Sequence, residues 1–157
     1  MTARWGTPTW VFFHTLIAKI EESKYMECRD DLLGHIKRLC EVLPCPDCAE
    51  HAIAHLSRIH IQSLPTKDSF KHMLLQFHNQ VNYRRYQPGF SSDKLVVYDK
   101  LNLGYLVKVF VHEFTKPLHN PRFFSDGMAR NARVQMVVQW LKVKGLIWTL
   151  HFYKQSI

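Results

Sequence analysis

Two cysteines separated by two residues, Cys45 and Cys48, are the strongest chemical signal in this 157-residue chain. They stand in the run Cys45-Pro46-Asp47-Cys48, where Pro46 suits the first turn of a helix. Thiols three residues apart at the start of a helix can close a disulfide across one turn. The positive end of the helix dipole favours a thiolate there, although the carboxylates of Asp47 and Glu50 act in the opposite direction. Such a pair can exchange electrons with other dithiols.

Three other interpretations compete with dithiol electron transfer. A thioredoxin-like motif requires a strand before the pair, whereas the preceding run GHIKRLCEVL has a helical pattern. Zinc is suggested by Cys45, Cys48, His51 and His55. A single helix, however, spreads roughly ten residues over about 15 Å, too far for four ligands of one ion. Two or three of them with ligands from elsewhere stay compatible with zinc. An inert thiol pair or a structural disulfide predicts no polar cluster nearby.

A polar cluster does occur, on the apolar stripe of the helix expected at 67–86. Asn82 and Arg85 follow His78 by four and seven residues, so the three share one helical face. Asn79 is adjacent to His78. His14 adds another imidazole on the apolar face of the first expected helix, one turn after Trp10. Polar groups on an inward face need hydrogen-bond partners. A buried planar ligand with polar edges would satisfy all of them together, so the cluster strengthens the functional interpretation of the cysteines.

Helical periodicity runs through nearly the whole sequence, so the predicted fold class is all-α. The apolar stripes predict helices over residues 8–22, 26–43, 46–58, 67–86, 92–100, 103–115 and 126–153. Thr7 and Pro8 are expected to be the N-cap and first-turn proline of the first helix. The last helix carries apolar residues on a second side, at Trp140, Val143 and Ile147, which predicts contact with another subunit.

Composition restricts the class of protein without identifying a partner. The chain is 46% hydrophobic and 22% charged, as in ordinary globular domains. Its net charge of +8 favours anionic partners in general, including a phosphate-bearing cofactor. We expect no signal peptide and no transmembrane helix, because no long apolar run is present. The absence of GxGxxG and P-loop motifs argues against Rossmann and Walker-type nucleotide sites.

Three segments together resemble the Erv/ALR family of FAD-linked sulfhydryl oxidases. They are WGTPTWVFFHTL at 5–16, LPCPDCAEH at 43–51 and FHNQVNYR at 77–84, in the family's order and at about its separations. The resemblance covers roughly residues 4–100. The short form, without a targeting region or a thioredoxin domain, is most similar to viral members from large DNA viruses.

The resemblance implies a four-helix bundle with a short fifth helix over residues 1–100, binding FAD and pairing into a homodimer. Residues 101–157 have no counterpart and are expected to be a helical extension, packed on the bundle or at a dimer interface. The resemblance implies that Cys48 approaches the flavin and that a substrate thiolate attacks Cys45. It also implies that the FAD is lined by Gly6, Trp10, His14, Cys48, His78, Asn79, Val81, Asn82, Tyr83 and Arg85. No metal is expected.

The activity implied is oxidation of protein dithiols, with electrons passing through Cys45 and Cys48 to FAD and then to O2, giving H2O2. A thioredoxin-like relay protein is one such substrate, nucleic acid is not an expected partner, and the implied location is the cytoplasm of an infected host cell or the virion. The chain departs from the family in having no cysteine after Cys48 and no CxxC partner for Cys28 or Cys40. We interpret these two as plain core or surface thiols. A non-enzymatic helical adaptor and a small zinc-binding module are the alternative functions.

Overall fold

The computed structural model describes residues 4–117 and 124–147, and every regular element in those two stretches is a helix. The all-α prediction is therefore confirmed. Four helices form the bundle: α1 (Gly6–Lys19), α2 (Tyr25–Cys40), α3 (Pro46–Leu56) and α4 (Lys67–Arg84). A short 3-10 helix, η3 (Ser92–Lys100), follows them as the fifth helix, and single turns η1 (Glu22–Lys24) and η2 (Ile61–Ser63) complete the connections. None of the helices in the described parts is both long and apolar enough to cross a bilayer.

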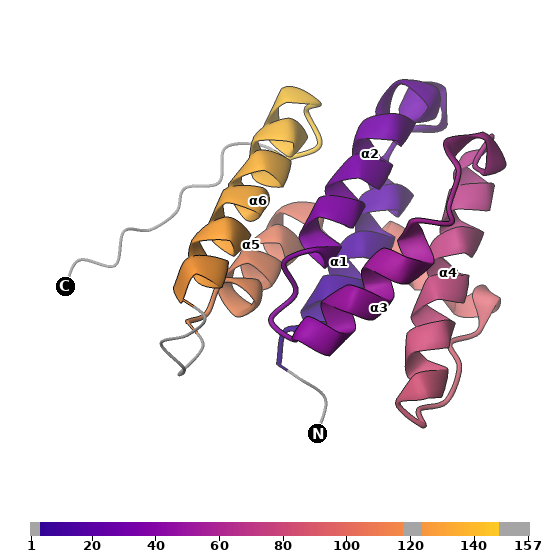
Figure 1. The fold of residues 1–157 in the computed structure, drawn as a ribbon. Coiled ribbons are helices and arrows are strands. Elements are labelled where there is room, and N and C mark those ends of the chain that lie inside the picture. Colours follow the sequence, from indigo (N-terminus) through magenta and orange to yellow (C-terminus); the bar gives the residue numbers. More distant parts are fainter. Residues whose placement is uncertain (1–3, 118–123, 148–157) are drawn as a thin grey trace.

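Two further helices, α5 (Leu103–Phe114) and α6 (Phe124–Val143), extend the bundle. They lie on one side of α1 and α2, whereas α3 and α4 lie on the other side (Figure 1). Phe110 and Phe114 of α5 are fully buried, and Phe110 stacks on Phe12 of α1 with ring centroids 4.3 Å apart. Residues of the bundle and of the extension belong to one continuous hydrophobic core, so the extension folds against the bundle.

The second apolar side of α6 is covered mainly within the same chain. Trp140 packs against His35 of α2, with ring centroids 5.0 Å apart. Ile147 is 4% exposed, whereas Val143 is 72% exposed. Of the three residues on this side, only Val143 is exposed enough to contact another subunit.

The helix ends differ from the predicted ends where distant groups or backbone geometry decide them. The first helix begins at Gly6, with Trp5 as N-cap, so the expected N-cap Thr7 is wrong. Pro8 is still tolerated because N–H groups of a first turn have no helical partner. This helix stops at Lys19 and not at 22. The Lys67 ammonium donates to the carbonyls of Ala18 and Ile20, at 2.9 and 2.6 Å. These carbonyls at the C-terminal end of the helix have no helical hydrogen-bond partner, so Lys67 satisfies them.

Five other predicted helices also end early, including 46–58, which ends at Leu56, and 103–115, which ends at Phe114. The second was expected to reach 43 but ends at Cys40. The fourth ends at Arg84. Tyr86 adopts φ 54, so the chain reverses there and the Gln87 N–H donates back to the Asn82 carbonyl at 2.9 Å, which caps the helix. The last, expected over 126–153, ends at Val143 because Gly145 adopts φ 67 in the same type of cap. Its expected continuation over 148–153 lies outside the described residues.

Candidate active site: a dithiol cleft between three helices

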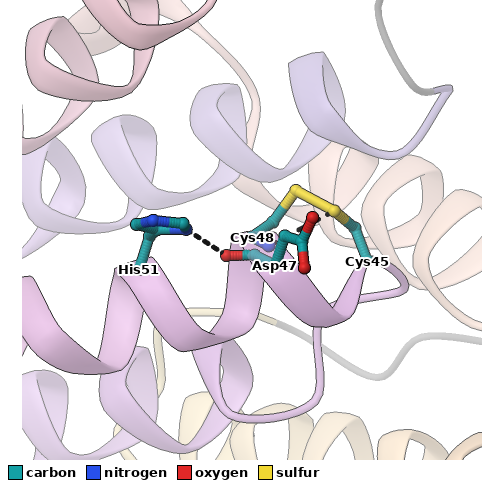
Figure 2. The surroundings of a disulfide bond; sticks show 4 residues. All are labelled: Cys45, Asp47, Cys48 and His51. Atoms are coloured by element: carbon teal, nitrogen blue, oxygen red, sulfur yellow. Dashed lines mark hydrogen bonds between the residues drawn. A yellow bond between two sulfur atoms is a disulfide. The ribbon is translucent and has the colours of Figure 1, made fainter.

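Cys45 and Cys48 form a disulfide at the start of α3, with their Cα atoms 5.2 Å apart (Figure 2). Cys45 is the N-cap residue, and its Sγ accepts the Cys48 backbone N–H at 3.3 Å. Pro46 occupies the first turn, where its missing N–H costs nothing. One turn later, the His51 ring bonds the Asp47 carbonyl oxygen. Both cysteines are half-buried at a helix N-terminus, where a thiolate released from the disulfide is stabilised.

The disulfide lies in the wall of a cleft of about 530 Å³, which we call the dithiol cleft. This volume is in the range of pockets that bind small molecules and cofactors. Apolar and aromatic side chains make most of its wall: Trp5, Trp10, Phe13, Leu43, Phe77 and Val81. The Trp10 ring meets the ring of Phe77 edge-on at 5.1 Å. The cleft thus offers flat apolar surfaces beside a reducible sulfur–sulfur bond, as a planar redox cofactor requires.

The cleft also has a basic rim. Arg4, Arg84 and Arg85 line it together with the acidic Asp47. A smaller cavity of about 200 Å³ adjoins it between α3 and α4, and shares His51 and Arg84 with it. Guanidinium groups bind phosphate oxygens through paired, charge-assisted hydrogen bonds. The rim therefore suits the phosphates of a nucleotide whose ring enters the cleft.

Two neutral imidazoles lie behind Trp10. His14 Nε2 and His78 Nδ1 are 3.2 Å apart, so one ring donates a hydrogen bond to the other. His78 also stacks on Trp10, with ring centroids 4.2 Å apart and planes 8° apart. Burial, followed by the nearby charge of His78, lowers the pKa of His14 to about 3, and burial lowers the pKa of His78 to about 4. The pair therefore fixes the indole that forms one wall of the cleft.

The two amides predicted to line a ligand form hydrogen bonds with the loop after α4. Asn79 donates to the Phe90 carbonyl at 2.9 Å and accepts the Phe90 N–H at 2.6 Å. Asn82 donates to the Pro88 carbonyl at 3.3 Å. Because these groups find partners inside the chain, their polarity no longer argues for a bound ligand.

The predicted site residues thus divide into two sets. The dithiol cleft brings together Cys45, Cys48, Gly6, Trp10, Val81 and Arg85. Outside its lining are His14, His78, Asn79, Asn82 and Tyr83. Tyr83 is 82% exposed. The assignment of this second set to a cofactor stays a prediction.

Several lining residues were missed from the sequence. On α1 these are Thr9 and Phe13, preceded by Trp5. They recur at intervals of four residues, so helical spacing could have indicated that they share one face. Cys40 also lines the cleft, although it is only 2% exposed. Burial raises the pKa of its thiol to about 12, assisted by Glu41, so Cys40 is a protonated wall residue.

A metal centre finds no support in the described stretches. Over residues 4–117 and 124–147, no three His, Cys, Asp or Glu side chains are placed to hold a metal ion. His51 bonds a backbone carbonyl, and His55 stacks on Phe77 with ring centroids 4.7 Å apart. Neither imidazole joins the cysteines in a ligand set.

Comparison with known proteins gives a family and two viral relatives. The sequence pattern of the Erv1 / Alr family matches residues 7–100. The putative FAD-linked sulfhydryl oxidase 347L of Invertebrate iridescent virus 6 is 28% identical over 90 residues, which cover 54% of this chain and 81% of that protein. The putative FAD-linked sulfhydryl oxidase 096R of Invertebrate iridescent virus 3 is 25% identical over 89 residues, covering 56% of this chain and 60% of that protein. No solved structure matches the chain significantly.

Proposed function

Because the chain belongs to the Erv1 / Alr family of FAD-binding proteins, we propose that it is an FAD-dependent sulfhydryl oxidase of protein dithiols. The observation that carries the proposal is the Cys45–Cys48 disulfide in the wall of an aromatic cleft of about 530 Å³. A structural disulfide alone would need no such cleft. The viral relatives with sulfhydryl oxidase names support the same activity.

The residues of the dithiol cleft fit FAD. In this proposal Trp10 and Val81 contact the isoalloxazine, Cys48 is the flavin-proximal sulfur, and Arg84 and Arg85 bind the phosphates. When bound, FAD supplies a two-electron acceptor that reoxidises the dithiol and transfers the electrons to O2, giving H2O2.

The polar residues outside the cleft lining, His14, His78, Asn79 and Asn82, have a supporting role in this proposal. His14 and His78 hold Trp10, while Asn79 and Asn82 hold the loop after α4. For His14 and His78 to line the FAD directly, as the resemblance implies, the stacked Trp10 and His78 rings would have to separate.

The chain's own chemistry is thiol–disulfide exchange. A substrate thiolate attacks Cys45 Sγ, forms a mixed disulfide and breaks the Cys45–Cys48 bond, so that Cys48 leaves as a thiolate. The N-terminus of α3 stabilises this leaving group. The second substrate thiolate then displaces Cys45. The product is a substrate disulfide, and both cysteines are reduced with the two electrons of the substrate.

A spectrum and a peroxide assay test this function. The purified protein is expected to be yellow, with a flavin absorption band, and to produce H2O2 from dithiothreitol in air. Cys45→Ser and Cys48→Ser are expected to abolish peroxide formation, while the matched control Cys28→Ser, a buried free thiol, retains it. A colourless folded protein, or full activity in either active-site variant, would contradict the proposal. A colourless protein that captures partners without Cys45 would favour the adaptor, and stoichiometric zinc the metal-binding module.

The quaternary structure, substrates and location complete the proposal. We expect a homodimer, which light scattering after size exclusion tests directly. Protein dithiols are the substrate class, with a thioredoxin-like relay protein as one candidate, and the cytoplasm of an infected cell or the virion is the setting. The viral relatives support a viral origin, and fractionation of infected cells measures the location.

A further inference from the structure

The C-terminal helix α6 is fastened along α2 by polar contacts as well as by its apolar side. Trp140 Nε1 donates to Asp31 at 3.1 Å, and the Lys144 ammonium lies 2.6 Å from Glu27. At the other end of α2, Arg133 lies 3.8 Å from Glu41. These contacts align α6 with α2 as far as the loop that leads into the Cys45–Cys48 disulfide.

One of the α6 contacts is buried and reaches that loop directly. Arg130 is 2% exposed, and its Nε donates to the Val42 backbone carbonyl at 3.0 Å. Val42 follows the last residue of α2 by two positions and precedes Cys45 by three. Carbonyls at a helix C-terminus lack helical partners and favour a positive charge nearby. A guanidinium at this place therefore satisfies the Val42 carbonyl where the chain leaves α2 for the disulfide.

The burial of a cation here has a cost that the contact must offset. Burial lowers the pKa of Arg130, and the negative charge of Asp126 acts in the opposite direction. A guanidinium nevertheless remains charged at any ordinary pH. Among apolar neighbours in α6 such as Val134 and Val137, an uncharged residue would fill the space with no desolvation cost. Packing alone thus gives no reason for an arginine at this position.

The loop that Arg130 holds also builds the dithiol cleft. Cys40 and Leu43, on either side of Val42, line the cleft together with Cys45. Fixing the Val42 peptide therefore fixes both the wall and the N-cap sulfur. Active-site groups need such support from residues outside the site, because small displacements cost large factors in rate.

We propose that Arg130 is a positioning residue, which reaches from the C-terminal extension to hold the Val42–Cys45 segment and, through it, the redox disulfide. The catalytic part of this inference rests on the proposed oxidase function. The structural part, that Arg130 holds the Val42–Cys45 segment, is independent of the oxidase function. It can be measured without an activity assay.

Hydrogen exchange on the full-length chain tests the structural part. Removal of a charge-assisted hydrogen bond with Arg130→Met is expected to speed exchange of the non-proline amides in residues 43–49 by about tenfold to a hundredfold. Exchange in α4 is expected to stay unchanged, which separates local release from general destabilisation. Arg130→Lys, which keeps a cationic donor, is expected to recover part of the protection. It also serves as the test variant if Arg130→Met fails to fold.

The matched control is Arg133→Met, in the same helix, which removes the part-exposed pair with Glu41 and a weak contact with Met136 Sδ. It is expected to leave exchange in residues 43–49 unchanged. Equal exchange in Arg130→Met and wild type, or an equal rise over the whole chain, would overturn the proposal.

Redox measurements test the catalytic part. In Arg130→Met the glutathione equilibrium of the Cys45–Cys48 couple is expected to shift, and kcat with dithiothreitol to fall about tenfold with little change in KM. An unchanged equilibrium and kcat would leave Arg130 without a catalytic role. If the wild-type protein forms no peroxide, the oxidase proposal fails, while the exchange data still decide whether Arg130 holds the loop.

Discussion

The buried imidazole of His14 makes the stability of the protein depend on pH in a way that one substitution can isolate. His14 is 2% exposed and is enclosed by His78, at 3.2 Å, and by the Tyr98 ring, at 4.8 Å between centroids. Burial and then the charge of His78 lower its pKa from 6.5 to about 3. In the unfolded chain the same group titrates near its ordinary value of about 6.5.

The direction of the pH effect on the free energy of unfolding follows from the number of protons that the folded and unfolded states bind. Between pH 6.5 and about 3, the unfolded chain protonates His14 and the folded chain does not. The stabilisation of the folded chain by neutral His14 is therefore complete above pH 6.5. It is lost as pH falls from 6.5 towards about 3. Each pH unit in this range costs about 1.4 kcal/mol, so the change from pH 7 to pH 5 costs about 2 kcal/mol. Its bonded neighbour His78, whose pKa burial also lowers, acts in the same direction.

Urea unfolding of the flavin-free chain, followed by far-ultraviolet circular dichroism at pH 7 and pH 5, measures this cost. His14→Gln keeps a hydrogen-bonding side chain but cannot titrate. Between pH 7 and pH 5, its free energy of unfolding is therefore expected to fall by about 2 kcal/mol less than that of wild type. The control His72→Gln removes an exposed imidazole that bonds only the Asp68 carbonyl, and it should lose as much as wild type. Equal losses in wild type and His14→Gln would refute the reasoning.

Three other predictions follow from packing, burial and capping. A chain truncated after Lys100 uncovers core normally sealed by α5, where each buried Phe contributes about 2 kcal/mol. We expect it to lose its cooperative thermal transition in calorimetry. Burial raises the pKa values of Cys28 and Cys40, so neither thiol should react with iodoacetamide in the folded protein at pH 8, while both react in urea, as mass spectrometry can show. Thr66→Ala removes the capping box of α4 and should cost about 1 kcal/mol in urea unfolding.

The elements of the fold could be predicted from the sequence because their apolar residues recur at helical spacing. The start of α3 was correct to the residue, since Pro46 marks a first turn locally. Helix ends were less predictable. The end of α1 is set by Lys67, which comes from α4 and is distant in sequence. The left-handed conformation of Tyr86 is set by the chain reversal after α4 and not by a residue type that favours it.

The candidate site was predictable to the extent that a single helix carries its residues. The spacing of Cys45 and Cys48 indicated the disulfide, and Trp10 lies in the cleft beside it. The partners of the polar cluster were less predictable for a physical reason: periodicity shows that a side chain points inward but not which group it meets there. Asn79 meets the backbone of Phe90, eleven residues later, because the loop folds back onto α4.

The helical extension contacts the walls of the dithiol cleft as well as the core. An appendage could be removed without effect on the cleft, but here aromatic contacts run from the extension into it. Phe110 stacks on Phe12 at 4.3 Å, Phe12 contacts Phe13 at 6.0 Å, and Phe13 meets Trp10 edge-on at 6.2 Å, with the last two rings lining the cleft. Arg130 reaches the opposite wall through the Val42 carbonyl. Two helices without a counterpart in the matched region 7–100 therefore support both walls of the dithiol cleft. Because closely packed interiors transmit small displacements, substitutions in either helix should alter flavin affinity before they unfold the bundle.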